Sequence, residues 1–193
     1  MPIPSHDLML PHVGLVTAFM ALLALAGLYK LVDHTPTSGA LRAAGLPSSP
    51  IVVRLLGGLE LVVGITGIVD GGPIPALAGA VLYAGFLVFV LEALRRRLPI
   101  SSCGCLGATE TPPTVAHVIV NLAAVATLVL GALFPIGMLG GLHEAELSTA
   151  IAFLLFTGAV VYLLHAVITV LPLRQGARRA ASVQLSMREP QQP

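Results

Sequence analysis

Hydrophobic positions along the chain fall into five long stretches, separated by short segments of polar and turn-forming residues. A membrane-spanning helix needs about 20 mostly apolar residues. The pattern predicts such helices over about residues 13–32, 51–69, 74–94, 115–139 and 150–171. We therefore expect an all-α fold, a polytopic membrane helix bundle. Residues 1–12 would form a short external N-terminus, 13–171 the bundle, and 172–193 a basic cytoplasmic tail.

Proline, glycine and small polar residues predict where these helices end. Residues 35–39 and 46–50 predict turns in the first connection, and Asp70-Gly71-Gly72-Pro73 predicts a tight turn in the second. Pro172 is expected to end the fifth helix, because proline cannot donate a helical hydrogen bond. The polar segment after Arg174 is expected to be disordered beyond its first few residues. The first apolar stretch is too long for a signal-peptide core and is expected to be a true span.

Composition supports the membrane interpretation. Hydrophobic residues make up 56% of the chain, charged residues only 10%, and the mean hydropathy is +0.94, whereas soluble domains carry about 25% charged residues. We expect a lipid bilayer as the surroundings. The net charge of +1 argues against nucleic acid as a partner. The chain contains only two cysteines, which excludes a disulfide-rich scaffold and a zinc site of four cysteines.

The basic residues predict an orientation. Positive charge is retained on the cytoplasmic side of a membrane. With five spans, every Lys and Arg falls in the first connection, the third connection or the C-terminal tail, which lie on one side. We expect the N-terminus outside, and the third connection and the C-terminus on the cytoplasmic side. The basic residues are Lys30, Arg42, Arg54, Arg95, Arg96, Arg97, Arg174, Arg178, Arg179 and Arg188.

The third connection holds both thiols, Cys103 and Cys105, with Gly104 between them. Residues two apart have Cα atoms about 5.5–7 Å apart, which overlaps the range of roughly 4.4–6.8 Å for disulfides. A ring this small is strained, and strained disulfides are reduced more easily. The arginines at 95–97 are close in sequence, and a nearby cation favours the thiolate. The pair is predicted to switch between dithiol and disulfide, with both cysteines catalytic.

Other uses of the same cysteines stay open. Two thiolates can hold Cu(I), so a copper-binding or copper-transport protein is an alternative. Zinc would need further ligands, for which His34 and His117 are candidates. In a third reading the cysteines are inert packing residues of a membrane scaffold subunit. No cofactor is predicted. Quinone use stays open but has no sequence signature, and the nucleotide and hydrolase motifs are absent.

A carboxylate lies deep in the second predicted span. Glu60 is about nine residues, or roughly 13 Å, from the start of that span. Such a group must be neutral, paired or facing a wet cavity, and Lys30 is a candidate partner. A role in handling protons near the thiols and a purely structural ion pair are both consistent with this position. Glu92 and Arg96, one helical turn apart, predict an ordinary surface pair.

Three further polar residues are candidates for supporting roles. His117 lies near the start of the fourth span, with Asn121 one turn deeper on the same face. His165 is about a turn and a half before the cytoplasmic end of the fifth span, so both histidines are expected at the membrane level of the cysteines. Histidine titrates near neutrality and could accept a thiol proton. The alternative is that each histidine only hydrogen-bonds a neighbouring helix.

Short motifs in the sequence resemble a known family. Cys103-Gly104-Cys105-Leu106-Gly107, between the third and fourth spans, resembles the Cys-Gly-Cys-Phe-Gly signature of MauE-type proteins in the MauE/DoxX group. Gly27-Leu28-Tyr29-Lys30-Leu31 resembles the Gly-x-x-Lys-Leu at the end of their first span. Asn121 falls where an Arg-Asn pair often begins their fourth span. The sequence departs from the pattern at Leu106, in place of Phe, and at Val120, in place of Arg.

The resemblance implies a four-helix core with a fifth helix added at its C-terminal end, in a bacterial cytoplasmic membrane. It implies thiol–disulfide chemistry with a thioredoxin-like partner. The namesake of the family is needed for maturation of the disulfide-rich small subunit of methylamine dehydrogenase, so a similar role in maturing disulfide-containing proteins is implied here. Such clients lie outside the cytoplasm, whereas the charge pattern predicts cysteines inside, so a relay across the membrane would be required.

Overall fold

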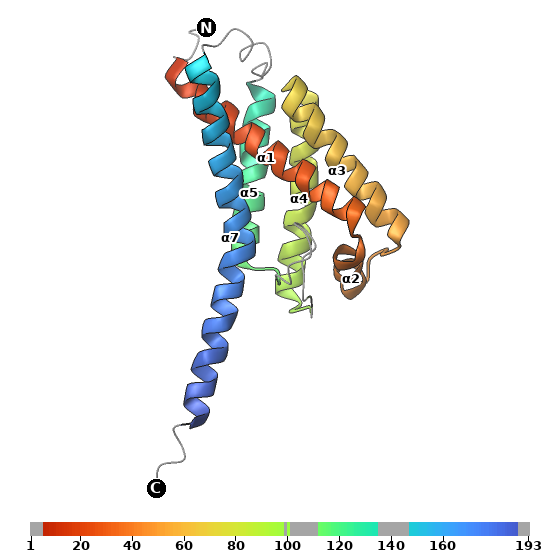
Figure 1. Cartoon of the computed structure of the whole chain (residues 1–193). Helices are drawn as coiled ribbons and strands as arrows, with labels where there is room; N and C mark the ends of the chain where they lie inside the picture. Colours follow the sequence, from red (N-terminus) through yellow and green to blue (C-terminus); the bar gives the residue numbers. More distant parts are fainter. Residues whose placement is uncertain (1–5, 99, 101–111, 135–146, 189–193) are drawn as a thin grey trace.

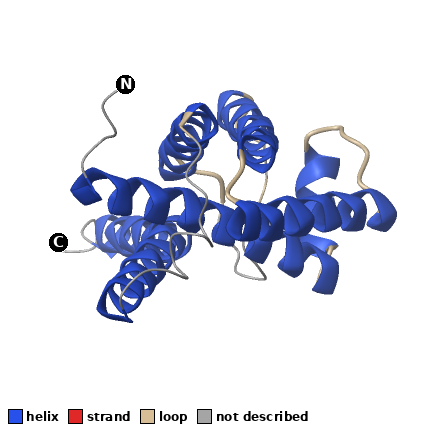
Figure 2. Cartoon of the chain, turned by 90° about the horizontal axis from the view of Figure 1, so that it is seen from above, coloured by secondary structure: helices blue, strands red, loops and turns tan. Residues whose placement is uncertain are grey.

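The computed structural model describes residues 6–98, 100, 112–134 and 147–188. Within these ranges the chain forms helices and connecting loops and no strand (Figures 1 and 2). Five helices are long and apolar enough to cross a membrane, which confirms the predicted all-α membrane bundle. The helices are α1 (His6–Val32), α2 (Thr35–Ala43), α3 (Pro50–Asp70), α4 (Pro73–Arg95), α5 (Val115–Leu133) and α7 (Leu147–Arg188).

The first helix is the centre of the bundle. α1 contacts α3, α4, α5 and α7, and its side chains Met20 and Leu23 are fully enclosed together with Leu128 of α5. Tyr83 of α4 ties the two helices together, since its hydroxyl donates to the carbonyl oxygen of Phe19 at 2.8 Å. An apolar environment offers no water to a tyrosine hydroxyl, so this bond removes the cost of burying it.

Glycines bring α1 and α3 unusually close together. A Cβ added at Gly57 would lie 2.8 Å from the carbonyl oxygen of Gly27 and 2.9 Å from Cβ of Lys30. At Gly64 it would lie 2.7 Å from the backbone nitrogen of Ala24. Small residues at helix contacts let backbones approach in a membrane, where no hydrophobic force drives helices together. The interface therefore depends on glycine at these positions.

The predicted turn at residues 70–73 is present. Gly71 ends α3 in the left-handed conformation with φ +61°, and Pro73 begins α4. Glycine adopts this conformation without the steric cost of a Cβ. The start of α3 is also encoded locally, because Ser49 Oγ accepts a hydrogen bond from Val52 N at 3.3 Å and Pro50 follows it.

Three predictions of helix ends were wrong. The segment at 35–39 is not a turn but the first part of α2. Asp33 Oδ1 accepts from Thr35 N at 2.9 Å and Pro36 is at the start of the helix, where its missing N–H costs nothing. The Thr35 side chain and backbone lower the pKa of Asp33 by hydrogen bonding to its carboxylate.

The fourth span ends earlier than predicted, and the fifth does not end where predicted. α5 stops at Leu133, because Phe134 precedes a proline and such residues avoid the α conformation; positions 135–139 lie outside the described residues. α7 continues through Pro172 to Arg188, so the segment after Arg174 is helical and not disordered. Its second half projects beyond the other helices in Figure 1.

All the basic residues lie toward one end of the molecule, here called the basic end. It comprises the last turns of α1 and α4, the first turns of α3 and α5, all of α2 and the second half of α7, at the bottom of Figure 1. The helix ends that hold Lys30, Arg54 and Arg95 meet there. The segregation seen in the sequence is therefore a property of the folded bundle.

Candidate functional site

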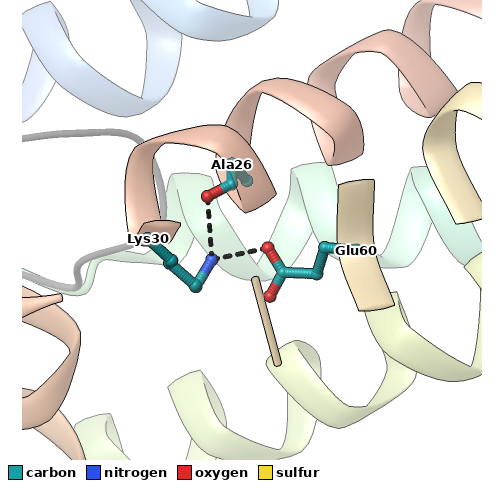
Figure 3. A network of polar contacts seen from close by, with 3 residues as sticks. All are labelled: Ala26, Lys30 and Glu60. Atoms are coloured by element: carbon teal, nitrogen blue, oxygen red, sulfur yellow. Dashed lines mark hydrogen bonds and ion pairs between the residues drawn. The ribbon is translucent and has the colours of Figure 1, made fainter. Parts of the chain in front are cut away.

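A buried ion pair joins α1 to α3 near the basic end. Lys30 Nζ lies 2.8 Å from Glu60 Oε2, and both side chains are almost completely enclosed, with exposed fractions of 4% and 0% (Figure 3). Lys30 Nζ also lies 3.5 Å from the carbonyl oxygen of Ala26 and 5.4 Å from the centre of the Phe86 ring. The partner of Glu60 suggested by the sequence is thus the one that the structure provides.

The glycine contact explains how the two side chains meet. Gly27 is one turn before Lys30 on α1, and Gly57 is one turn before Glu60 on α3. A Cβ at Gly27 would collide with the Gly57 carbonyl oxygen and lie 3.0 Å from Cβ of Glu60. The short distance between the backbones lets a carboxylate reach the ammonium group without leaving the interior. This is a physical reason for the Gly-x-x-Lys spacing in the sequence.

Only one of the two carboxylate oxygens of Glu60 has a hydrogen-bond partner in the described part of the chain. Glu60 Oε1 is buried and has no hydrogen-bond partner in the described part of the chain. A buried charge needs both a counter-ion and hydrogen bonds, because the cost of removing it from water otherwise exceeds the attraction. Packing alone does not account for such a pair, because burying both charges costs free energy of solvation.

A small cavity of about 40 Å³ lies beside the ion pair, where four helices converge. Lys30 lines it from α1, and His117 and Asn121 line it from α5. Tyr83 and Phe86 of α4, with apolar side chains of α1, α5 and α7, form the remaining walls. These apolar residues are Leu22, Leu23, Ala26, Val120 and Ile168.

His117 is held by its own helix end. Its Nδ1 accepts a hydrogen bond from Thr114 N at 3.3 Å and lies 3.0 Å from Thr114 Oγ1. A nitrogen that accepts carries no proton, so in the neutral ring the proton is on Nε2. Asn121 Nδ2 donates to the His117 carbonyl oxygen at 2.7 Å. Within the described part of the chain, the hydrogen bonds of both side chains stay within α5 and its N-cap residue Thr114. The alternative interpretation had instead expected His117 to bond a neighbouring helix.

Sequence reasoning missed the aromatic wall of this site. Tyr83 stacks edge-to-face between Phe19 and Phe86, with ring centres 5.9 and 6.1 Å away. The signal was present, since residues 83 and 86 are three apart and share one helical face. Nothing in the sequence indicated that this face turns toward Lys30 instead of lipid.

The remaining predicted residues are not part of the cluster. His165 is half-buried on α7 but does not line the cavity, and its ring nitrogen lies 3.5 Å from Thr169 Oγ1. Glu92 forms the predicted surface pair with Arg96, and a second with Arg95 at 3.1 Å. Cys103, Gly104 and Cys105 lie outside the described residues. Within the described part of the chain, no group of three or more His, Cys, Asp or Glu is placed to hold a metal ion.

Comparison with known proteins identifies the family. The comparisons with curated proteins and with solved structures found no match. The model of the family described as "Methylamine utilisation protein MauE" matches residues 9–135, which is more than half of the 193-residue chain. This range contains all but the first three residues of α1, the helices α2 to α5, the buried ion pair and both cysteines, and it ends before α7. The chain is thus a multi-pass membrane protein that belongs to the MauE family.

Proposed function

We propose that this chain is an integral membrane thiol–disulfide redox protein that exchanges electrons with a thioredoxin-like partner through Cys103 and Cys105. The observation that carries the proposal is the Cys103-Gly104-Cys105 motif, the only thiols of the chain, in a protein of the MauE family. Its role would be to help disulfide-containing proteins mature, with a pathway of the methylamine dehydrogenase type as one example.

The exchange is a balanced two-electron step. The thiolate of one cysteine attacks a sulfur of the partner disulfide, which breaks the partner's S–S bond and forms a mixed disulfide. The second cysteine then attacks the mixed disulfide and releases the partner as a dithiol. The chain is left with a Cys103–Cys105 disulfide, and the reverse sequence transfers the electrons back. Either direction is chemically complete with these two reactants.

The position of the motif in the chain supports the proposal. Residues 101–111 connect Ile100, which is buried against Ala40 and Ala93, to Pro112, three residues before α5 begins. Both anchor points are at the basic end, where His117 occupies the first turn of α5. Arginines follow one another at 95–97 at the end of α4, and a cation in reach of a thiol lowers its pKa and favours attack.

We further propose that the basic end, and with it the cysteines and the C-terminus, faces the cytoplasm. The gathering of every Lys and Arg at this end supports it. In intact cells, a C-terminal reporter that is active only in the cytoplasm should then be active, and one that is active only outside should be silent. The opposite pattern would reject this orientation.

The redox proposal is tested by substituting the cysteines. Cys103→Ser and Cys105→Ser should each abolish thiol-dependent function, because a lone thiol can attack but cannot resolve the intermediate. One variant should trap a mixed disulfide with a partner protein, visible on a non-reducing gel and lost with reductant. The control is Ser102→Ala, which removes a neighbouring polar group and keeps both thiols.

The double variant Cys103→Ser/Cys105→Ser decides between the proposal and its alternatives. If it supports the thiol-dependent process as well as the wild type does, the redox proposal fails and a scaffold role replaces it. Copper bound in stoichiometric amount by the purified wild type and absent from the double variant, with no mixed disulfide in either single variant, would instead favour copper handling.

A further inference from the structure

The cavity between α1, α4, α5 and α7 presents nitrogen donors inside an apolar enclosure. Lys30 Nζ makes one short bond, to Glu60, and one long contact of 3.5 Å, to the Ala26 carbonyl. An ammonium group has three donors, so it retains capacity toward the cavity that Lys30 lines. Polar groups that converge on an otherwise apolar cavity are typical of a binding site.

The α5 wall adds further donors. The backbone N–H of Thr114 donates to Nδ1 of His117, so in the neutral ring the proton is on Nε2, which remains as a donor. The amide of Asn121 uses one N–H for the His117 carbonyl, and its second N–H remains. The site is thus suited to a group that accepts hydrogen bonds.

Charge and size restrict what that group can be. Glu60 already balances the charge of Lys30 at 2.8 Å, so the cavity has no net positive charge for an anion. A volume of about 40 Å³ exceeds the roughly 10–15 Å³ needed for one water. It admits an oxygen and the atoms bonded to it but not a bulky headgroup.

We propose that this cavity binds an uncharged group whose oxygen atom accepts hydrogen bonds. Lys30, His117 and Asn121 would donate to that oxygen, and the rings of Tyr83 and Phe86 form the aromatic wall beside it. Two sources supply this chemistry inside a membrane. One is a trapped water, and the other is the carbonyl group of a membrane-dissolved molecule such as a quinone, of which only the carbonyl oxygen and the atoms bonded to it would enter the cavity. The described residues that line the cavity belong to α1, α4, α5 and α7.

The carbonyl source is tested with decylubiquinone labelled with ¹³C at a ring carbonyl, added to the purified full chain in lipid nanodiscs. A bound carbonyl that accepts hydrogen bonds absorbs at lower infrared frequency than the free carbonyl. The shifted band should appear in the wild type and be lost in Asn121→Leu, which keeps the side-chain size and removes the amide. The matched control His165→Phe, which alters a histidine outside the cavity, should retain it.

The water source is tested without added quinone, by hydroxyl-radical labelling, which modifies side chains beside bound water. Tyr83 and Phe86 should be labelled well above Leu128, which is fully buried away from the cavity, and Asn121→Leu should reduce this labelling several-fold. A shifted carbonyl band supports the site with a quinone-type ligand, and labelling without the band supports it with water. A wild type that shows neither overturns the proposal.

The outcome does not depend on the proposed redox function. The variant Cys103→Ser/Cys105→Ser should give the same band or the same labelling as the wild type, since the proposal assigns the hydrogen bonds to the ligand to Lys30, His117 and Asn121 and none to a thiol. Loss of thiol-dependent function with the site retained would leave both proposals standing. A retained site in a protein whose thiols prove dispensable would reject only the redox function.

Discussion

Two helix contacts of α1 differ in kind, although both lie within one bundle. Against α3, backbones meet through Gly27, Gly57 and Gly64, and the contact holds a buried ion pair. Against α7, side chains meet instead, with Phe156 lying over Gly14 and the hydroxyl of Thr157 buried without a partner in the described chain. In an 18-residue window of each span, 61% of the residues of α1 are buried but only 17% of those of α7.

The α1–α3 contact belongs to the core of the bundle, whereas the α1–α7 contact joins an added outer helix to that core. The α1–α3 contact requires small residues on both helices, and only this close approach lets Lys30 reach Glu60. At the α7 contact, a Cβ added at Gly14 would first meet the ring of Phe156 and not backbone. Phe156 is partly exposed and can move toward lipid, so this contact tolerates changes better. The family match includes the first contact and ends before α7, as expected if the site and not the outer helix defines the fold.

The largest effect is expected from removing the cation of the buried pair. Lys30→Met leaves the buried Glu60 without a counter-ion, which costs about 3–5 kcal/mol. Lys30→Met/Glu60→Leu removes both charges and should regain most of this stability. The measurement is the free energy of unfolding in mixed micelles titrated with denaturing detergent. Equal stability of Lys30→Met and the wild type would show that the pair is hydrated and not enclosed.

The next largest change in stability is expected at Gly57 of α3, and the adjacent Gly58 provides the control. Gly57→Ala places a methyl group 2.8 Å from the Gly27 carbonyl oxygen, and overpacking of this kind costs about 1–3 kcal/mol. Gly58→Ala meets nothing within 4 Å and should be neutral or stabilise the helix by up to about 1 kcal/mol. The same detergent titration compares the two. If both variants behave alike, the close approach of α1 and α3 does not limit stability.

Much of this core could be predicted from sequence because each signal was strong. A carboxylate some nine residues inside an apolar stretch demands a partner, and Lys30 is the only Lys or Arg within another predicted span. Length and hydropathy alone were enough to place five spans. The family resemblance through residues 27–31 and 103–107 also held, since both motifs lie inside the matched range.

The parts that could not be predicted depend on tertiary contacts or on competing local preferences. The face of α4 that bears Tyr83 and Phe86 is not marked by polarity, so only packing reveals that it borders the ion pair. α2 forms where Pro36 and small polar residues suggest a turn, because proline is also acceptable in the first turn of a helix. Pro172 breaks one backbone hydrogen bond but does not end α7.

A smaller effect, with opposite sign, is expected at the α1–α7 contact. The buried hydroxyl of Thr157 has no hydrogen-bond partner in the described chain, and an unsatisfied buried donor is destabilising. Thr157→Val keeps the shape and removes the hydroxyl, so it should be neutral or stabilise the protein by up to about 1 kcal/mol. The control is Thr17→Val on α1, whose hydroxyl donates to the Val13 carbonyl at 2.7 Å and which should not stabilise. Destabilisation by Thr157→Val would reveal a partner for this hydroxyl.

The smallest effect is expected from shortening α7. Its second half extends past the ends of the other helices that the structure describes (Figure 1). A chain that ends after Gln175 keeps the whole candidate span Leu147–Thr169 and should unfold with a free energy within about 0.5 kcal/mol of the full chain, as surface changes do. A chain that ends after Leu133 loses the α1–α7 contact and should be clearly less stable. It should still retain the infrared or labelling signature of the ion-pair cavity in weakened form, since Ile168 is the one residue of α7 among the described residues that line the cavity. If the chain that ends after Gln175 were destabilised as much as the chain that ends after Leu133, the second half of α7 would belong to the core. The two helix contacts of α1 would then not differ as described above.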